Sequence, residues 1–408
     1  MRLITRRFCH LASALALAGS SLSFAQGVTI GGTPAEGEAT GIMAMFAGDR
    51  FENFRNMERF VPTSEMTVSP NPWDLGKSDN SLSFSGDFLG KPTTLEEFID
   101  LSNTSAFLVI KDGQLIYENY SHGDSPQSLH TSFSVAKSFT SALTGIALGE
   151  GHLGSLDDPV RKYLPELTSD TFDDVTVKDV LQMSSGIRFT EVYTDPEADI
   201  NRMTAQVPPL TYLEYMNGLG RDHPPGTFNH YASINTQLLG ILLVRVTGKP
   251  ITEYMQEKLW HPLGMEQRGL WTLDEQGYEL AMGGLAASAR DYAKLGLLYL
   301  HDGRRGDQQI LPAGWARESV IPDEAHLMPG ENPASSNTSG YMYQWWTPRN
   351  PDNDFLARGI WGQNIYVHPD NGVVIVKLAA DQQNFNADYK LAYVDYLQDI
   401  AQSLGAEE

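Results

Sequence analysis

Two hydrophobic hairpins stand far apart along the chain. Residues 106–110 form a continuous apolar run, Asp112-Gly113 marks a tight turn, and residues 115–117 return as a second apolar run. The same pattern recurs at 364–367 and 373–378, on either side of the turn pair Asn371-Gly372. Although most of the chain separates them, both hairpins have the character of strands in one antiparallel sheet. We therefore predict that they pair.

The stretch between the hairpins is helical in character. Phe139, Leu143 and Ile146 recur at positions i, i+4 and i+7, which places them on one helix face. This helix is expected to end near Gly149, where two glycines flank Glu150. The same criterion predicts helices over 175–183, 235–246, 251–259, 287–299 and 389–404.

Strands at both ends with helices between them indicate a sheet domain into which a helical domain is inserted. We expect an α+β protein whose sheet domain comprises residues 101–154 and 286–408, with a mostly helical domain over 155–285. Residues 26–100 are rich in Gly, Pro, Ser and Asn and only weakly periodic. This composition predicts an extended N-terminal lead-in that wraps the domain.

The first 25 residues have the pattern of an export signal. Three arginines precede a short apolar run at 11–18, and Ser23-Phe24-Ala25 fits the small-x-small rule for signal peptidase. The alternative is a disordered N-terminus, and Arg6-Arg7 leaves the twin-arginine route open beside the general one. We expect cleavage near Ala25 and a periplasmic or secreted protein. Because no later segment has about 18 consecutive apolar residues, no membrane span is expected.

Composition narrows the classes of function. With 29 Lys+Arg against 51 Asp+Glu, the net charge of -22 argues against non-specific nucleic-acid binding and against an anionic membrane surface. The single cysteine, Cys9, excludes an internal disulfide framework and a Cys-rich zinc site. The ten histidines show no metal-ligand spacing, and no nucleotide-binding loop or G-x-S-x-G elbow occurs. We therefore expect no metal, no cofactor and no nucleic-acid partner.

Ser134 and Lys137 form the one S-x-x-K motif of the chain. Positions i and i+3 of a helix share a face, so the lysine amine can return to the serine hydroxyl. A lysine whose pKa is lowered by burial or by a nearby cation can take the serine's proton. The unpaired N–H groups at a helix start also favour a developing negative charge. The alternative is a helix-capping serine beside a solvated lysine.

The sequence around this pair resembles the serine β-lactamase and penicillin-binding protein superfamily. Residues 131–151 are similar to its active-site helix, and Tyr231-Ala232-Ser233, which follows the turn at 225–228, resembles its Tyr-x-Asn/Ser element. The resemblance implies a serine β-lactamase-like fold, an antiparallel sheet flanked by helices, with the active site where the helical domain meets it. Similar segments occur in order at 156–160, 163–166, 175–186, 261–265, 283–285 and 343–346.

The resemblance implies two-step acyl transfer. Ser134 would attack a carbonyl while Lys137 and Tyr231 handle protons, and the backbone N–H groups of Ser134 and Ile360 would form the oxyanion hole. A phenolate at Tyr231, favoured by two nearby cations, would help to deprotonate the serine and then protonate the leaving group. Residues 117–119 also fit Tyr-x-Asn, but Tyr117 lies upstream on a predicted strand.

One element of the superfamily is altered. Members that process penicillins carry Lys-Thr-Gly beside the nucleophile and use it to grip the β-lactam carboxylate. Here the matching residues are Ala357-Arg358-Gly359. The change disfavours penicillin hydrolysis, although Arg358 offers a substitute charge. A β-lactamase or D,D-peptidase stays an alternative, as does a non-catalytic ligand-binding or sensor module on the same fold.

A narrower resemblance is to the aminohexanoate-dimer (nylon-oligomer) hydrolases and β-lactamase-like carboxylesterases. Residues 359–364 are similar to Gly-Ile-His-Gly-Gln-Asn of these hydrolases, with Trp361 in place of His, and residues 192–196 to their loop with a substrate-contacting tyrosine. An exported serine hydrolase of a small ester or amide is implied, with its oligomeric state left open. Tyr193 can equally be an ordinary loop aromatic, and Trp345 and Trp346 can be core or pocket. The candidates for substrate contact are Tyr193, Ser233, Gly359, Trp361 and Gln363.

Overall fold

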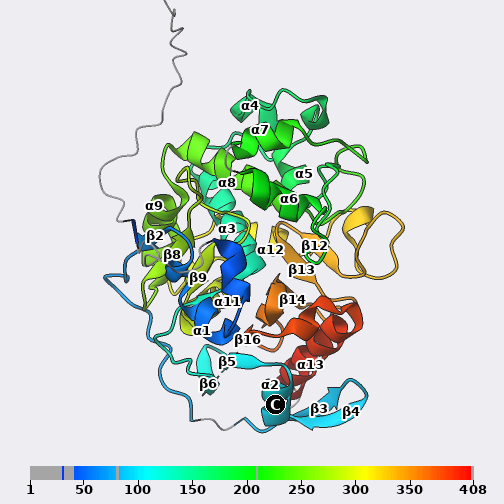
Figure 1. The fold of residues 1–408 in the computed structure, drawn as a ribbon. Coiled ribbons are helices and arrows are strands. Elements are labelled where there is room, and N and C mark those ends of the chain that lie inside the picture. Colours follow the sequence, from blue (N-terminus) through cyan, green and yellow to red (C-terminus); the bar gives the residue numbers. More distant parts are fainter. Residues whose placement is uncertain (1–29, 32–40, 80–81, 208–209, 406–408) are drawn as a thin grey trace, which may run out of the picture.

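The computed structural model describes residues 30–31, 41–79, 82–207 and 210–405. The predicted export signal at 1–25 lies outside these ranges. Within them, every helix is too short or too polar to cross a bilayer. Figure 1 shows a helical region above a sheet region, with the chain passing from one to the other and back.

The two hydrophobic hairpins pair in one antiparallel sheet, as predicted. The first hairpin is β5 (Thr104–Lys111) and β6 (Gln114–Tyr120), and the second is β15 (Gln363–His368) and β16 (Val373–Ala379). Strand β16 lies antiparallel beside β5, so that Val376 faces Leu108. The full order is β12-β13-β14-β15-β16-β5-β6. The remaining strands are β12 (Gly340–Met342), β13 (Trp345–Thr347) and β14 (Phe355–Gly359).

Alternate residues of β5 face two separate hydrophobic layers, because successive side chains of a strand point to opposite faces. Ala106, Leu108 and Ile110 pack into the larger core. Phe107 and Val109 pack into the second core. The larger core is covered by α11 (Ala289–Leu300), and the second by α2 (Leu95–Leu101) and α13 (Ala387–Gly405).

The predicted helices are all present. The long α3 (Ala136–Gly149) packs against α8 (Ser233–Thr247) in the centre of the helical region (Figure 1). The predicted helix over 251–259 is split into α9 (Ile251–Met255) and a π-helical turn. Other elements of this region are α4 (Val160–Tyr163), η4 (Asp170–Phe172), α5 (Val177–Leu181), α6 (Asp199–Gln206), α7 (Tyr212–Asn217), η5 (Gln256–Trp260) and α10 (His261–Leu263). Beyond α11 lie β10 (Arg304–Arg305), β11 (Gln308–Gln309), α12 (Trp315–Glu318) and η6 (Ala325–Leu327).

The N-terminal segment, expected to be an extended lead-in, instead holds several short elements. Its side chains form a third hydrophobic cluster with residues from distant parts of the chain. Local hydrophobic periodicity therefore does not predict these elements. Strand β2 (Thr63–Met66) joins a second antiparallel sheet of order β1-β2-β8-β9-β7. The other elements of the N-terminal segment are β1 (Ile30–Gly31), η1 (Ile42–Phe46), α1 (Arg50–Arg55), η2 (Met57–Arg59), β3 (Ser85–Phe88) and β4 (Lys91–Thr94). The remaining strands of the second sheet come from later in the chain and are β7 (His130–Thr131), β8 (Gly269–Thr272) and β9 (Leu285–Ala287).

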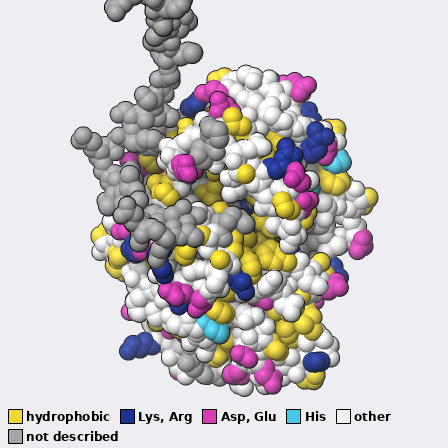
Figure 2. Space-filling view, in the orientation of Figure 1, with side chains coloured by type: hydrophobic (Ala, Val, Ile, Leu, Met, Phe, Trp, Pro, Cys, Tyr) yellow, Lys and Arg dark blue, Asp and Glu magenta, His cyan; other side chains and the backbone are white. Residues whose placement is uncertain are grey.

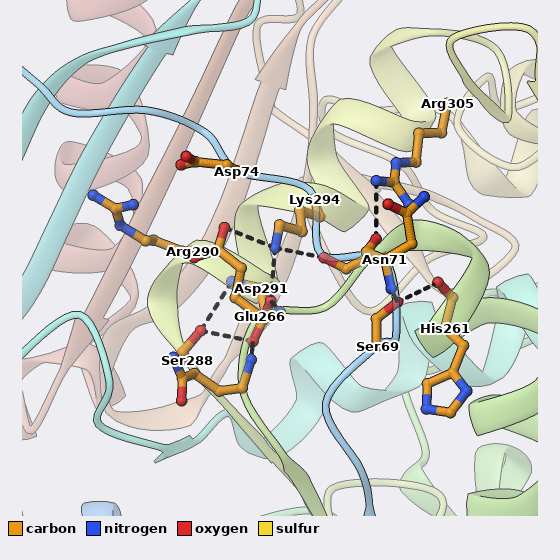
Figure 3. A network of polar contacts seen from close by, with 12 residues as sticks. Ser69, Asn71, Asp74, His261, Glu266, Ser288, Arg290, Asp291, Lys294 and Arg305 are labelled. Carbon is orange, nitrogen blue, oxygen red and sulfur yellow. Dashed lines mark hydrogen bonds and ion pairs between the residues drawn. The ribbon is translucent and has the colours of Figure 1, made fainter.

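A polar network ties the stretch after β2 to the turn that follows α10 (Figure 3). The Ser69 hydroxyl donates to the His261 carbonyl at 2.9 Å. Nearby, the fully buried Lys294 ammonium donates to the Gly264 carbonyl at 2.8 Å and to the Asp291 carboxylate at 3.0 Å. Glu266 lies 3.0 Å from the same ammonium, so the buried charge has two anionic partners. The Trp73 backbone N–H also donates to the Gly264 carbonyl at 2.8 Å, so this network anchors the N-terminal segment beside α11.

Candidate active site

Ser134 and Lys137 lie at the start of α3, where the helical region meets the sheet. Ser134 is in the 3-10 turn η3 (Phe133–Val135), and Lys137 is in the first turn of α3. The Lys137 Nζ donates to the Ser134 Oγ at 2.9 Å and to the Met282 carbonyl at 2.5 Å. Burial lowers the pKa of Lys137 to about 8, although the charge of Glu191 raises it. A substantial fraction of the amine is thus neutral near pH 8 and can accept a proton.

Tyr231 lies beside this pair, just before α8. Its ring centroid is 5.2 Å from Lys137 Nζ, and the ring stacks on Trp346 at 5.1 Å. Burial and the charge of Glu191 raise the pKa of Tyr231 above its usual 10, against the opposing effects of Ser134, Arg358 and Ser233. The structure therefore favours a neutral phenol, in place of the phenolate expected from the sequence. A neutral phenol can donate a proton but is a poor base.

Glu191 is a site residue that the sequence analysis missed. Its carboxylate accepts hydrogen bonds from the backbone N–H and the hydroxyl of Ser233, each at 2.7 Å. It also accepts one from the Tyr193 hydroxyl at 2.5 Å. Tyr193 and Ser233 both line the cavity that contains Ser134. No motif marks Glu191, and the signal that could have found it is its position two residues before Tyr193.

Gly359 brings the end of β14 against the nucleophile turn. A Cβ built on Gly359 would lie 2.2 Å from the Ser132 carbonyl and 3.2 Å from the Ser134 nitrogen, so a larger residue would force the strand away. The next residue, Ile360, starts the turn η7 (Ile360–Gly362) and lines the same cavity as Ser134. The close approach at this glycine therefore places the backbone of Ile360 next to that of Ser134.

Trp361 and Gln363, expected to touch substrate, do not line this cavity. The Gln363 side chain is buried behind it, where its amide donates to the Ile360 carbonyl at 3.3 Å and to the Ala379 carbonyl at 2.7 Å. The Trp361 backbone has a φ of 64°, and its ring packs into the third hydrophobic cluster with residues of the N-terminal segment. Both side chains support the turn at Ile360 from behind.

The two tryptophans of β13 lie in different places: Trp345 is in the hydrophobic core, and Trp346 is at the site. Trp345 is fully buried against Tyr299, with ring centroids 4.4 Å apart. Trp346 lies under Tyr231, and the Arg358 guanidinium sits 4.1 Å from the centroid of the Trp346 ring. Tyr117, the rival Tyr-x-Asn tyrosine, packs in the second hydrophobic core.

The cavity next to Ser134 has a volume of about 700 Å³ and mostly apolar walls. Its lining comes from the N-terminal segment, from α6, and from loops around 272–283. Among the described lining residues, Asp274 and Glu275 are the charged ones, and none is Lys, Arg or His. Figure 2 shows hydrophobic side chains gathered in the middle of this face, between the helical and sheet regions. The walls of the cavity thus suit a neutral, apolar group better than a carboxylate.

An antiparallel sheet, a helical region and an S-x-x-K serine at their junction define a serine hydrolase of the β-lactamase and penicillin-binding protein class. The Beta-lactamase family model matches residues 102–398. The chain belongs to this family.

Two relatives extend over much of the chain. The 6-aminohexanoate-dimer hydrolase of Paenarthrobacter ureafaciens is 30% identical over 295 residues, which are 70% of this chain and 75% of the relative. A solved structure from Bacillus anthracis, assigned as a 6-aminohexanoate-dimer hydrolase, is 26% identical, covers 91% of this chain and 99% of its own, and has a TM-score of 0.75. A class C β-lactamase from Rhodobacter sphaeroides shares the fold at 19% identity, with a TM-score of 0.55 over 75% of this chain and 97% of its own.

Proposed function

We propose that this protein is an exported serine hydrolase that cleaves a small, uncharged ester or amide through an acyl-enzyme on Ser134. One observation carries the proposal. The Nζ of a buried lysine, whose pKa is lowered to about 8, lies 2.9 Å from the Ser134 hydroxyl oxygen. This is the arrangement that a serine needs in order to lose its proton near neutral pH.

The first half of the reaction forms the acyl-enzyme. The neutral Lys137 amine takes the Ser134 proton as the Oγ attacks the substrate carbonyl carbon. The backbone N–H groups of Ser134 and Ile360 hold the oxygen that becomes negative. Tyr231, held as a neutral phenol, donates its proton to the departing alcohol or amine and regains one from the Lys137 ammonium. The bond from the carbonyl carbon to the leaving group breaks, and the acyl group stays on Ser134.

The second half releases the acyl group. Water replaces the leaving group and attacks the acyl carbonyl carbon while the neutral Lys137 amine takes its proton. The Ser134 ester bond then breaks, and the Lys137 ammonium returns the proton to the serine oxygen, which leaves a carboxylic acid and a free serine. Since ester and amide substrates pass through the same tetrahedral intermediate, the site geometry accommodates both.

The cavity supports an uncharged substrate. Its walls are apolar and its described charges, Asp274 and Glu275, are negative. Penicillins and D-Ala-D-Ala peptides carry a carboxylate, which this lining would repel. The 6-aminohexanoate-dimer hydrolase relative favours screening linear amides, with the terminal carboxylate both free and esterified, beside short esters.

The test is hydrolysis of a short-chain p-nitrophenyl ester by the purified protein beside Ser134→Ala. Ser138→Ala is the matched control, because Ser138 is a buried serine in the first turn of α3, four residues after Ser134, and its hydroxyl donates to the Gln344 carbonyl. We expect Ser134→Ala to lose at least about 10³-fold in kcat and Ser138→Ala to stay within a few-fold of the parent. An equal rate in parent and Ser134→Ala would overturn the nucleophile. Faster turnover of a chromogenic cephalosporin than of the ester would overturn the uncharged substrate.

A further inference from the structure

Residues 41–62 of the N-terminal segment reach the active site. The Phe46 ring stacks on Phe133 and on Trp361, with centroids 5.8 Å apart in both pairs. Phe133 directly precedes Ser134, and Trp361 directly follows Ile360. One aromatic ring thus lies against the neighbours of both residues whose N–H groups are proposed to hold the oxyanion.

Phe54 of α1 completes this contact from behind. Its ring meets Phe133 edge-on at 5.1 Å and Trp361 at 5.9 Å. Phe54 is fully buried and does not line the cavity, so it touches the oxyanion turns without touching the space for substrate. The Arg50 guanidinium adds a cation-π contact 4.8 Å from the Trp361 ring centroid.

Both contacted residues have a backbone conformation that bulky side chains disfavour. The φ of Phe133 is 48° and that of Trp361 is 64°, both in the left-handed region. Such a conformation is costly for a non-glycine residue and persists where the surrounding packing holds it in place. Phe46 and Phe54 are the rings that pack on both residues, and they lie outside the residues 102–398 matched by the family model. Phe385, inside that range, packs on Trp361 with ring centroids 5.1 Å apart.

We propose that Phe46 and Phe54 are positioning residues, an aromatic clamp that fixes the two strained turns so that the N–H groups of Ser134 and Ile360 converge on one oxygen. The proposal rests on the proposed acyl-enzyme function. It gives the N-terminal segment a part in catalysis, beyond its contribution to packing. A misplaced oxyanion donor weakens binding of the tetrahedral intermediate while leaving ground-state binding in the apolar cavity intact.

Phe54→Ala tests the clamp, because it removes a ring that contacts both turns but no wall of the cavity. We expect kcat for the p-nitrophenyl ester to fall about 10- to 100-fold while KM changes less than about threefold. Affinity for an arylboronic acid, which forms a tetrahedral adduct with the serine, should fall by the same factor as kcat. Phe54→Leu, which keeps most of the volume, should show a smaller loss of the same kind.

Phe98→Ala is the matched control. Phe98 is equally buried, but its ring packs on Tyr396 at 4.1 Å in the second core. All variants are compared at a temperature where circular dichroism shows them folded, and active enzyme is counted with a fluorophosphonate. Equal kcat losses in Phe54→Ala and Phe98→Ala, or kcat of Phe54→Leu and Phe54→Ala within twofold of the parent, would overturn the clamp. A parent without Ser134-dependent hydrolysis would overturn the proposed function itself, which separates the two failures.

Discussion

Two buried lysines of this protein have the same perturbed ionisation and different surroundings. Lys137 and Lys377 are each 1% exposed, and burial lowers the pKa of each to about 8. Lys137 lies 2.9 Å from the Ser134 hydroxyl oxygen at the edge of the cavity. Lys377 lies in the middle of β16, where its Nζ approaches the carbonyls of Ser102 at 3.4 Å and Gly362 at 3.5 Å.

The difference shows that a lowered pKa does not identify a base. Removal from water disfavours the charged amine equally in both places. What separates the two lysines is the neighbour: a hydroxyl with a proton to give at Lys137, and carbonyls with none at Lys377. The geometry and the lowered pKa together support the proton transfer proposed for Lys137.

Exchanging each lysine for methionine gives the largest expected contrast. Lys137→Met should lower kcat/KM for the ester by about 10³-fold, since a positioned general base contributes about 10²–10⁴. Lys377→Met should stay within about tenfold of the parent, because its Nζ touches no reacting group and reaches the Ile360–Gly362 turn through one long contact of 3.5 Å with the Gly362 carbonyl. Steady-state kinetics of both variants, with active sites titrated, checks the pair. Similar losses in the two would refute the assignment.

Sequence patterns predicted those parts of the fold and the site that depend on neighbouring residues in the chain. The hairpins at 106–117 and 364–378 are each marked by a turn pair, and the helix after Ser134 by its spacing, so their positions followed directly. Lys137 is reached from Ser134 by helix geometry. The resemblance to a known family added Tyr231 and Ile360, which lie far away along the chain.

The remaining features depend on contacts between distant segments. Glu191 belongs to the site because it accepts hydrogen bonds from Ser233, and Phe54 because its ring contacts Trp361. Neither contact follows from a local sequence pattern. The side chain of Trp361 was expected in the cavity, but the left-handed φ of 64° at this residue accompanies its packing against the N-terminal segment. The protonation of Tyr231 likewise follows from burial and the charge of Glu191, which become visible once the chain is folded.

The second prediction concerns the free energy of unfolding, which the buried charge of Lys377 lowers. Its folded-state pKa of about 8 lies below the unfolded value of about 10.4, so below pH 8 the protein holds a disfavoured buried charge. The unfolded chain binds more protons between pH 8 and 10.4, and wild-type stability therefore rises across this window. Lys377→Met removes the charge and should increase the free energy of unfolding at pH 7 by about 2–3 kcal/mol.

Denaturant unfolding of both proteins from pH 7 to 10 measures this effect. The advantage of Lys377→Met should shrink as pH rises above 8, because the wild-type lysine becomes neutral in the folded state. A constant difference across this range would mean that packing, rather than charge, separates the two proteins.

The smallest expected effect concerns Glu191, a carboxylate whose charge acts on Lys137 but not on Lys377. In the proposed mechanism Lys137 acts as the neutral amine, so kcat/KM should rise with pH to a plateau, with a midpoint near the lysine pKa of about 8. The charge of Glu191 raises that pKa. Glu191→Gln should therefore move the midpoint to lower pH, by less than about one unit.

Gln is a fair replacement for Glu191 because its side-chain carbonyl can still accept a hydrogen bond from the hydroxyl of Tyr193 or Ser233. Each pH profile is normalised to its own plateau. Lys377→Met should leave the midpoint in place, since its amine lies outside the proton path. A midpoint that moves with Lys377 and stays fixed with Glu191 would reverse the roles assigned to the two lysines.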